Sequence, residues 1–168
     1  MTRLSVAVHL PADVRAAVAA LPREPVPGII WSLPAQWIVK VRPLGHVAER
    51  LVAALVEALA AELAGAPAVT CVLGPVTERR SGQWLAAPVA GLDELAEAVF
   101  DATAGLVPVT HPQPFRADLV LARGRVPKEV GGAPLAASWT ATAVVLVADR
   151  SAPGRPRLDD LAAFPLRE

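Results

Sequence analysis

The side chains best suited to acid–base chemistry in this chain are its three histidines, His9, His46 and His111. They are scattered, and the single cysteine, Cys71, lies in the apolar stretch VTCVLG. Zinc sites are typically built from closely spaced cysteines and histidines, so this spacing predicts no metal site. No nucleophile-elbow motif accompanies a serine. We therefore expect the histidines to be solvated or hydrogen-bonded and Cys71 to be a core residue.

Two apolar segments, QWIVKVR at 36–42 and PFRADLVLARGR at 114–125, carry charges that suit an anionic ligand. Lys40 and Arg42 lie in the first segment and Arg123 lies in the second, and cationic side chains of this kind can form charge-assisted hydrogen bonds. The run ARGRVPK, which extends to Lys128, is either a solvated loop or a phosphate contact.

The four tryptophans are widely spaced along the chain. Trp37, Trp84 and Trp139 lie in predicted strands, so we expect them in the core. Trp31 precedes the first charged segment and is the candidate for stacking on a base.

Composition narrows the class of protein. The 168 residues suffice for one domain or two small lobes that share a core. Hydrophobic residues make up 54% and charged residues 19%, which excludes global disorder. Sixteen basic and sixteen acidic residues give no net charge, so no strongly basic surface points to nucleic acid. No apolar run approaches the ~20 residues of a membrane helix. A single cysteine favours a reducing compartment, so we expect a cytoplasmic protein.

The elements that must position these residues follow from hydrophobic periodicity. In the first half we predict strands at 3–9 and 36–42 and helices at 11–21 and 46–64, with Pro43-Leu44-Gly45 ending the second strand. In the second half we predict strands at 68–73, 83–87, 116–122 and 140–148, a polar loop at 78–82, a helix at 92–106 and a closing segment at 157–166. No glycine-rich nucleotide-binding turn follows a strand, so an α+β fold with antiparallel strands is favoured.

Taken in order, five segments resemble the 2H phosphoesterase superfamily, and within it the LigT-like group of RNA 2′,3′-cyclic phosphodiesterases, also called 2′-5′ RNA ligases. The segments are RLSVAVHLP, QWIVKVRPLG, QWLAAPV with GLDELAEAV, PFRADLVLARGR and SAPGRPRLDDLAAFPL. The resemblance implies a bilobal α+β fold, two pseudo-symmetric lobes of antiparallel sheet and helices around a central groove. It implies that residues 1–168 form a single domain of two interleaved lobes.

The family is named for two His-x-Thr motifs that face each other across the groove. The resemblance implies that one histidine acts as general base and the other as general acid, while both threonines hold the phosphate. That chemistry needs neither a metal nor a cofactor. Alternate residues of a strand share one face, which explains the spacing of the motif.

This sequence departs from both motifs. The histidine and threonine positions of the first are Ile38 and Lys40, and those of the second are Asp118 and Val120. Each lost acid or base is worth roughly 10² to 10⁴ in rate, so no catalytic residue is assigned. Leu158 also stands where relatives often carry tyrosine.

Lys40 and Asp118 replace two of these positions with opposite charges, and three roles for Lys40 remain open. It forms an ion pair with Asp118 across the lobe interface, directly or through water, with Ile38 and Val120 packed beside it. Alternatively, it holds an anionic group of a nucleotide or RNA together with Arg42 and Arg123. The third role is a side chain that only extends into solvent.

The sequence therefore predicts a degenerate 2H phosphoesterase homologue without phosphodiesterase or ligase activity, which binds a nucleotide or RNA end weakly in its groove. One alternative is an active RNA 2′,3′-cyclic phosphodiesterase or 2′-5′ RNA ligase, a hydrolase that uses non-standard residues. Another is a protein-interaction module with a filled groove and an unknown protein partner.

Overall fold

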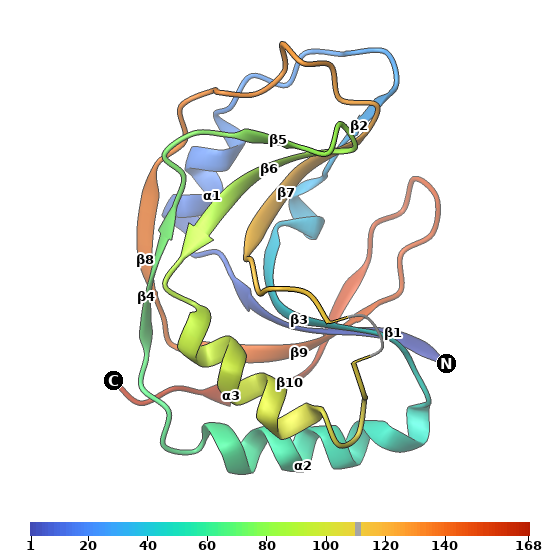
Figure 1. The fold of residues 1–168 in the computed structure, drawn as a ribbon, viewed down its shortest axis with the longest axis vertical. Helices are drawn as coiled ribbons and strands as arrows, with labels where there is room; N and C mark the ends of the chain where they lie inside the picture. Colours follow the sequence, from blue (N-terminus) through green and yellow to red (C-terminus); the bar gives the residue numbers. More distant parts are fainter. Residues whose placement is uncertain (110–111) are drawn as a thin grey trace.

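The computed structural model describes residues 1–109 and 112–168. In these residues the strands form two antiparallel sheets, one of four strands and one of six (Figure 1). The first contains β1 (Thr2–His9), β3 (Ile38–Val47), β9 (Ala143–Asp149) and β10 (Leu158–Pro165), in the order β10-β9-β1-β3. The second contains β2 (Ile29–Trp31), β4 (Val69–Leu73), β6 (Trp84–Ala90), β7 (Asp118–Gly124) and β8 (Ala137–Ala141), in the order β2-β7-β6-β4-β8, with β5 (Glu78–Arg80) paired to β6.

The helices cover one end and one side of the sheets. The helices are α1 (Ala12–Ala19), α2 (Val52–Leu63) and α3 (Asp93–Thr103), with short 3₁₀ turns at Pro34–Gln36 and Glu49–Leu51. Figure 1 shows α2 and α3 packed against each other, with α3 also against β3 and α2 against β10. The predicted leucine stripe of α2 is buried at Leu55, Leu59 and Leu63. In the described part of the chain, no helix is long and apolar enough to cross a membrane.

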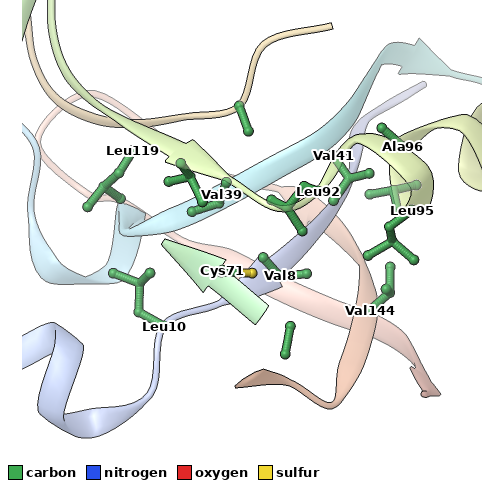
Figure 2. Packing of buried hydrophobic residues seen from close by; sticks show 14 of the residues in the cluster. Val8, Leu10, Val39, Val41, Cys71, Leu92, Leu95, Ala96, Leu119 and Val144 are labelled. Carbon is green, nitrogen blue, oxygen red and sulfur yellow. The ribbon is translucent and has the colours of Figure 1, made fainter. Parts of the chain in front are cut away.

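One hydrophobic cluster contains residues of both sheets and holds the two sheets together. Figure 2 shows Val8 and Val39 of the four-stranded sheet packed near Cys71 and Leu119 of the six-stranded sheet. Cys71 is fully buried, which confirms its predicted core role. The burial raises the pKa of its thiol to about 11.

Four features of the predicted elements are wrong. β3 continues through Pro43-Leu44-Gly45, because it stays paired to β1 across two register shifts, so the helix predicted from His46 begins only at Val52. The stretch 140–148 forms two strands in different sheets, and part of the predicted loop 78–82 pairs with β6 as β5.

Gly91, between β6 and α3, allows this connection to approach the backbone of β4 closely. Its φ is +104°, and a Cβ there would lie 2.0 Å from the carbonyl oxygen of Thr70. Gly91→Ala is therefore expected to lower the free energy of unfolding by more than about 1 kcal/mol, measured by urea denaturation. Gly105→Ala is the control, because no heavy atom lies within 4 Å of the added Cβ. Equal effects of the two substitutions would refute this account of Gly91.

Candidate functional site

An open groove of about 1290 Å³ lies between the two sheets and is bordered by α3. Ile38 and Lys40 line it from the four-stranded sheet, and Asp118 and Val120 line it from the six-stranded sheet. The four positions singled out in the sequence therefore border one cavity, although they come from strands far apart in the chain. The side chains of the described residues leave this groove open. This argues against the alternative of a protein-interaction module with a filled groove.

The floor of the groove on the four-stranded sheet is an apolar patch. It consists of Ala7, Ile38, Val145 and Val147, with Leu158 packed against them. β1 and β3 place Ala7 directly opposite Lys40. The Lys40 side chain thus leaves the backbone between aliphatic neighbours and extends into the open groove.

Arg3 and Asp149 supply the charges around Lys40. They are cross-strand partners on β1 and β9, and both line the groove. Desolvation, and then the charge of Arg3, lower the pKa of Lys40, while the charge of Asp149 opposes this shift.

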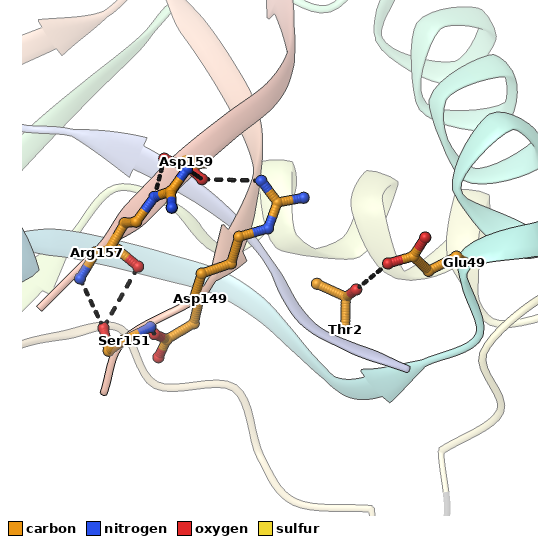
Figure 3. A network of polar contacts seen from close by, with 7 residues as sticks. Thr2, Glu49, Asp149, Ser151, Arg157 and Asp159 are labelled. Atoms are coloured by element: carbon orange, nitrogen blue, oxygen red, sulfur yellow. Dashed lines mark hydrogen bonds and ion pairs between the residues drawn. The ribbon is translucent and has the colours of Figure 1, made fainter. Parts of the chain in front are cut away.

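Asp149 is itself held in place at the end of β9. Figure 3 shows Asp149 and Ser151 at the start of the β9–β10 hairpin, where the Ser151 N–H donates to Asp149 Oδ1 at 3.0 Å. Desolvation alone would raise the pKa of Asp149, but hydrogen bonding from Ser151 and the charges of Arg3 and Lys40 lower it. Asp149 is therefore an anionic neighbour of Lys40 on the same wall of the groove.

Lys40 and Asp118 form no direct ion pair, so the direct form of the pair predicted from the sequence is wrong. Arg80 Nη2 lies 3.0 Å from Asp118 Oδ1, and Arg116 Nε lies 3.6 Å from Asp118 Oδ2. Arg80 also contacts Glu78, with Nη1 2.6 Å from Oε2. The Asp118 charge is thus balanced within its own sheet, and Lys40 forms no ion pair with any described residue.

Arg42, predicted to hold phosphate, serves the fold instead. Its guanidinium donates to Thr103 Oγ1 and, at 2.6 Å, to the carbonyl oxygen of Val107, and it lies over the ring of Phe100 at 5.4 Å from the centroid. Only 9% of Arg42 is exposed, and burial lowers its pKa. These contacts fasten the end of α3 to β3, so Arg42 does not present a free cation to a ligand.

Known structures share this arrangement of sheets and groove. The crystal structure of TT0787 of Thermus thermophilus is 25% identical, with 98% of both chains covered and a TM-score of 0.82. E. coli LigT in complex with 3′-AMP is 22% identical, with 99% of both chains covered and a TM-score of 0.85. A crystal structure of a phosphoesterase is 22% identical over 100% of both chains, with a TM-score of 0.82. The chain has the 2H phosphoesterase fold. No protein-family model and no curated protein matches its sequence.

The structural match confirms the resemblance inferred from the sequence, including the α+β class and the two antiparallel sheets around a groove. Within the 2H fold, Ile38 is 8% exposed and belongs to the apolar floor, while Val120 is 36% exposed on the opposite wall. Neither side chain can accept or donate a proton. The described groove lining includes no histidine.

On the six-stranded wall of the 2H groove, exposed apolar side chains flank Arg123, which forms no ion pair with a described residue. Arg123 lies between Ile30 on β2 and Trp84 on β6 in the strand register. Trp84 is 43% exposed, so its predicted core position is wrong, whereas Trp37 and Trp139 are buried as predicted. Six exposed large hydrophobic residues line the groove, namely Ile30, Trp84, Phe100, Val109, Phe115 and Val120.

Trp31 also lines the groove, as the sequence led us to expect. Its indole N–H donates to the carbonyl oxygen of Glu24 at 3.0 Å, which fixes the plane of the ring. An oriented aromatic ring at the rim of a groove can stack on a planar ligand.

The two described histidines, His9 and His46, do not line the groove. His9 Nε2 lies 2.9 Å from Asp160 Oδ2, and His9 is opposite Ile38 in the β1–β3 register. His46 is an exposed residue of β3, and His111 lies outside the described residues. Sequence reasoning missed the partnership of His9 with Asp160, because the two residues are far apart in the chain. In the described part of the chain, no cluster of histidine, cysteine, aspartate or glutamate is arranged to hold a metal ion.

Proposed function

We propose that this chain is a degenerate 2H phosphoesterase homologue, acting as one domain, whose groove binds a nucleotide or an RNA end weakly without turning it over. One observation carries the proposal. The chain has the fold of LigT and an open groove, but all four motif positions in that groove carry aliphatic or charged side chains. These are Ile38, Lys40, Asp118 and Val120. A cytoplasmic location is part of the proposal and rests on the single cysteine of the chain.

The groove retains groups that suit a nucleotide. Lys40 and Arg123 have no ion-pair partner among the described residues, so they are available to an anionic group. Trp31 and Trp84 offer aromatic faces beside them. E. coli LigT has been crystallised in complex with 3′-AMP, NADP+, ATP and phosphate, so nucleotides and phosphate bind to a protein with this fold.

Binding is tested by calorimetric titration with 3′-AMP and, separately, with inorganic phosphate. We expect weak binding of both that is reduced several-fold in Lys40→Met and in Arg123→Met. Lys128→Met is the matched control, because Lys128 is exposed in the loop after β7 and does not line the groove. Equal losses in all three variants, or no binding to the wild-type protein, would overturn the proposal.

Asp118→Asn should strengthen the binding of inorganic phosphate several-fold. The substitution removes a negative charge from the groove wall and leaves Arg80 with Glu78 as its remaining acidic partner. We also expect a loss of about 1 kcal/mol in the free energy of unfolding, because Asp118 and Arg80 are partly buried.

The control for this prediction is Asp101→Asn, an exposed position on α3 outside the groove lining. It should change neither phosphate affinity nor stability. If Asp118→Asn leaves phosphate affinity unchanged, the anion does not bind near that wall.

One observation favours a second candidate, an active cyclic phosphodiesterase with non-standard residues. The carboxylate of Asp160 orients His9, and His9 lies opposite the position of the first lost histidine. An imidazole held by a carboxylate is suited to act as a general base. His9→Ala decides between the two candidates, since any turnover by the second one requires that imidazole.

A further inference from the structure

We propose that Lys40 is a nucleophilic amine that captures, as an imine, a small aldehyde bearing an anionic group in the groove. The inference goes beyond nucleotide binding and does not depend on it. It rests on the placement of Lys40 over an apolar floor, next to a second cation, in a cavity large enough for a small molecule.

The apolar floor favours the neutral amine. Ala7 lies opposite Lys40, Ile38 precedes it by two residues on the same face, and Val147 and Leu158 complete the patch. Lysine amines become nucleophilic where an apolar pocket removes water from them or where another cation lies close. Lys40 is exposed to the groove beside this apolar patch, and Arg3 lines the same groove.

The two charged neighbours of Lys40 act in opposite directions, and the effect of Arg3 on its pKa is larger than that of Asp149. Arg3 on β1 and Asp149 on β9 are its charged neighbours on the four-stranded sheet, and desolvation with Arg3 lowers the pKa of Lys40 against the smaller effect of Asp149. Across the groove, Asp118 is held by Arg80 and Arg116, and it forms no ion pair with Lys40. The acidic groups that α3 contributes to the lining are Asp93 and Glu97.

The groove selects a particular class of aldehyde. Arg3 and Arg123 can receive an anionic group, and the exposed apolar side chains of the six-stranded wall can cover an aromatic or aliphatic body. The amine nitrogen of Lys40 attacks the carbonyl carbon, and a proton moves from nitrogen to oxygen to give a carbinolamine. Loss of water then leaves a C=N bond, with no change in oxidation state.

The chain offers a sharp test because it contains only two lysines, Lys40 and Lys128. The probe is pyridoxal 5′-phosphate, an aromatic aldehyde with a phosphate, followed by borohydride to reduce the imine to a stable secondary amine. Modification at Lys40, Lys128 and the N-terminal amine is then quantified by peptide mass spectrometry. We expect Lys40 to be modified several-fold faster than Lys128 in the folded protein, and both to react alike in denaturant.

Two variants and a second probe complete the experiment. Lys40→Arg keeps the positive charge but cannot form an imine, so it should lose the fast modification, whereas Lys128→Arg should retain it. Pyridoxal without the phosphate should react more slowly with Lys40 than pyridoxal 5′-phosphate does, because the anionic anchor is missing.

Equal rates at Lys40 and Lys128 in the folded wild-type protein would overturn the inference, whatever the variants do. A failure of 3′-AMP to bind, with fast modification of Lys40 intact, would refute the proposed nucleotide function and leave this inference standing.

Discussion

Purified protein incubated with nucleoside 2′,3′-cyclic phosphates is expected to release no product above the uncatalysed background. Catalysis by a pair of histidines depends on proton transfer to and from the reacting oxygens, and Ile38 and Asp118 stand at both histidine positions. A general acid and a general base each contribute roughly 10² to 10⁴ to the rate. Without both of them, the rate is expected to fall by a factor of at least about 10⁴. Product is measured by chromatography, with an active cyclic phosphodiesterase assayed alongside.

The outcome that contradicts this expectation also identifies its cause. Turnover that persists in the wild-type protein and disappears in His9→Ala would move the reaction centre to the His9–Asp160 pair. Turnover that survives His9→Ala would place the chemistry on groups that neither the sequence nor the groove geometry singles out. A neutral Asp160→Asn variant separates the two roles of this pair, because it keeps the imidazole and removes the charge that orients it.

Arg42→Met is expected to lower the free energy of unfolding by about 2–4 kcal/mol. The substitution keeps an apolar stem against Phe100 but removes the donors to Thr103 and to the carbonyl oxygen of Val107. Hydrogen bonds from charged donors are each worth about 1.5–3 kcal/mol, and Thr103 is fully buried. The measurement is urea denaturation followed by tryptophan fluorescence.

Arg123→Met is the matched control for Arg42→Met. Arg123 is exposed on β7 and its side chain makes no hydrogen bond to a described residue, so loss of that side chain should change stability by no more than about 0.5 kcal/mol. Arg42→Lys should recover only part of the lost stability, because an ammonium cannot reproduce the two-pronged geometry of the guanidinium. Equal effects at positions 42 and 123 would mean that the buried contacts of Arg42 contribute nothing.

The local sequence pattern predicted most elements of the fold. Alternating apolar residues predicted β1 and the core face of β3, and the leucine stripe predicted the buried face of α2. Such patterns are readable because a strand repeats every two residues and a helix every 3.6, whatever else the chain does. Trp37, with the parity of the core face, is 2% exposed.

Elements that depend on distant partners could not be predicted in this way. Residues 78–80 look polar and become a strand only because β6 offers free backbone groups to pair with. The apolar stretch 140–148 reads as one strand, yet its two parts join different sheets on either side of Thr142. Tryptophan in a strand is usually a core residue, but Trp84 is exposed because it lines the groove.

The sequence by itself determined that the two motif strands carry no imidazole, since residue types at 38, 40, 118 and 120 do not depend on folding. Tertiary structure alone decided which charges meet. Asp118 pairs with Arg80, 38 residues away, and not with Lys40, because β5 is brought beside β6 and so within reach of β7. The energy of an ion pair falls as the distance between the two charges grows. Which charged residues pair therefore depends on strand register, which no local sequence pattern encodes.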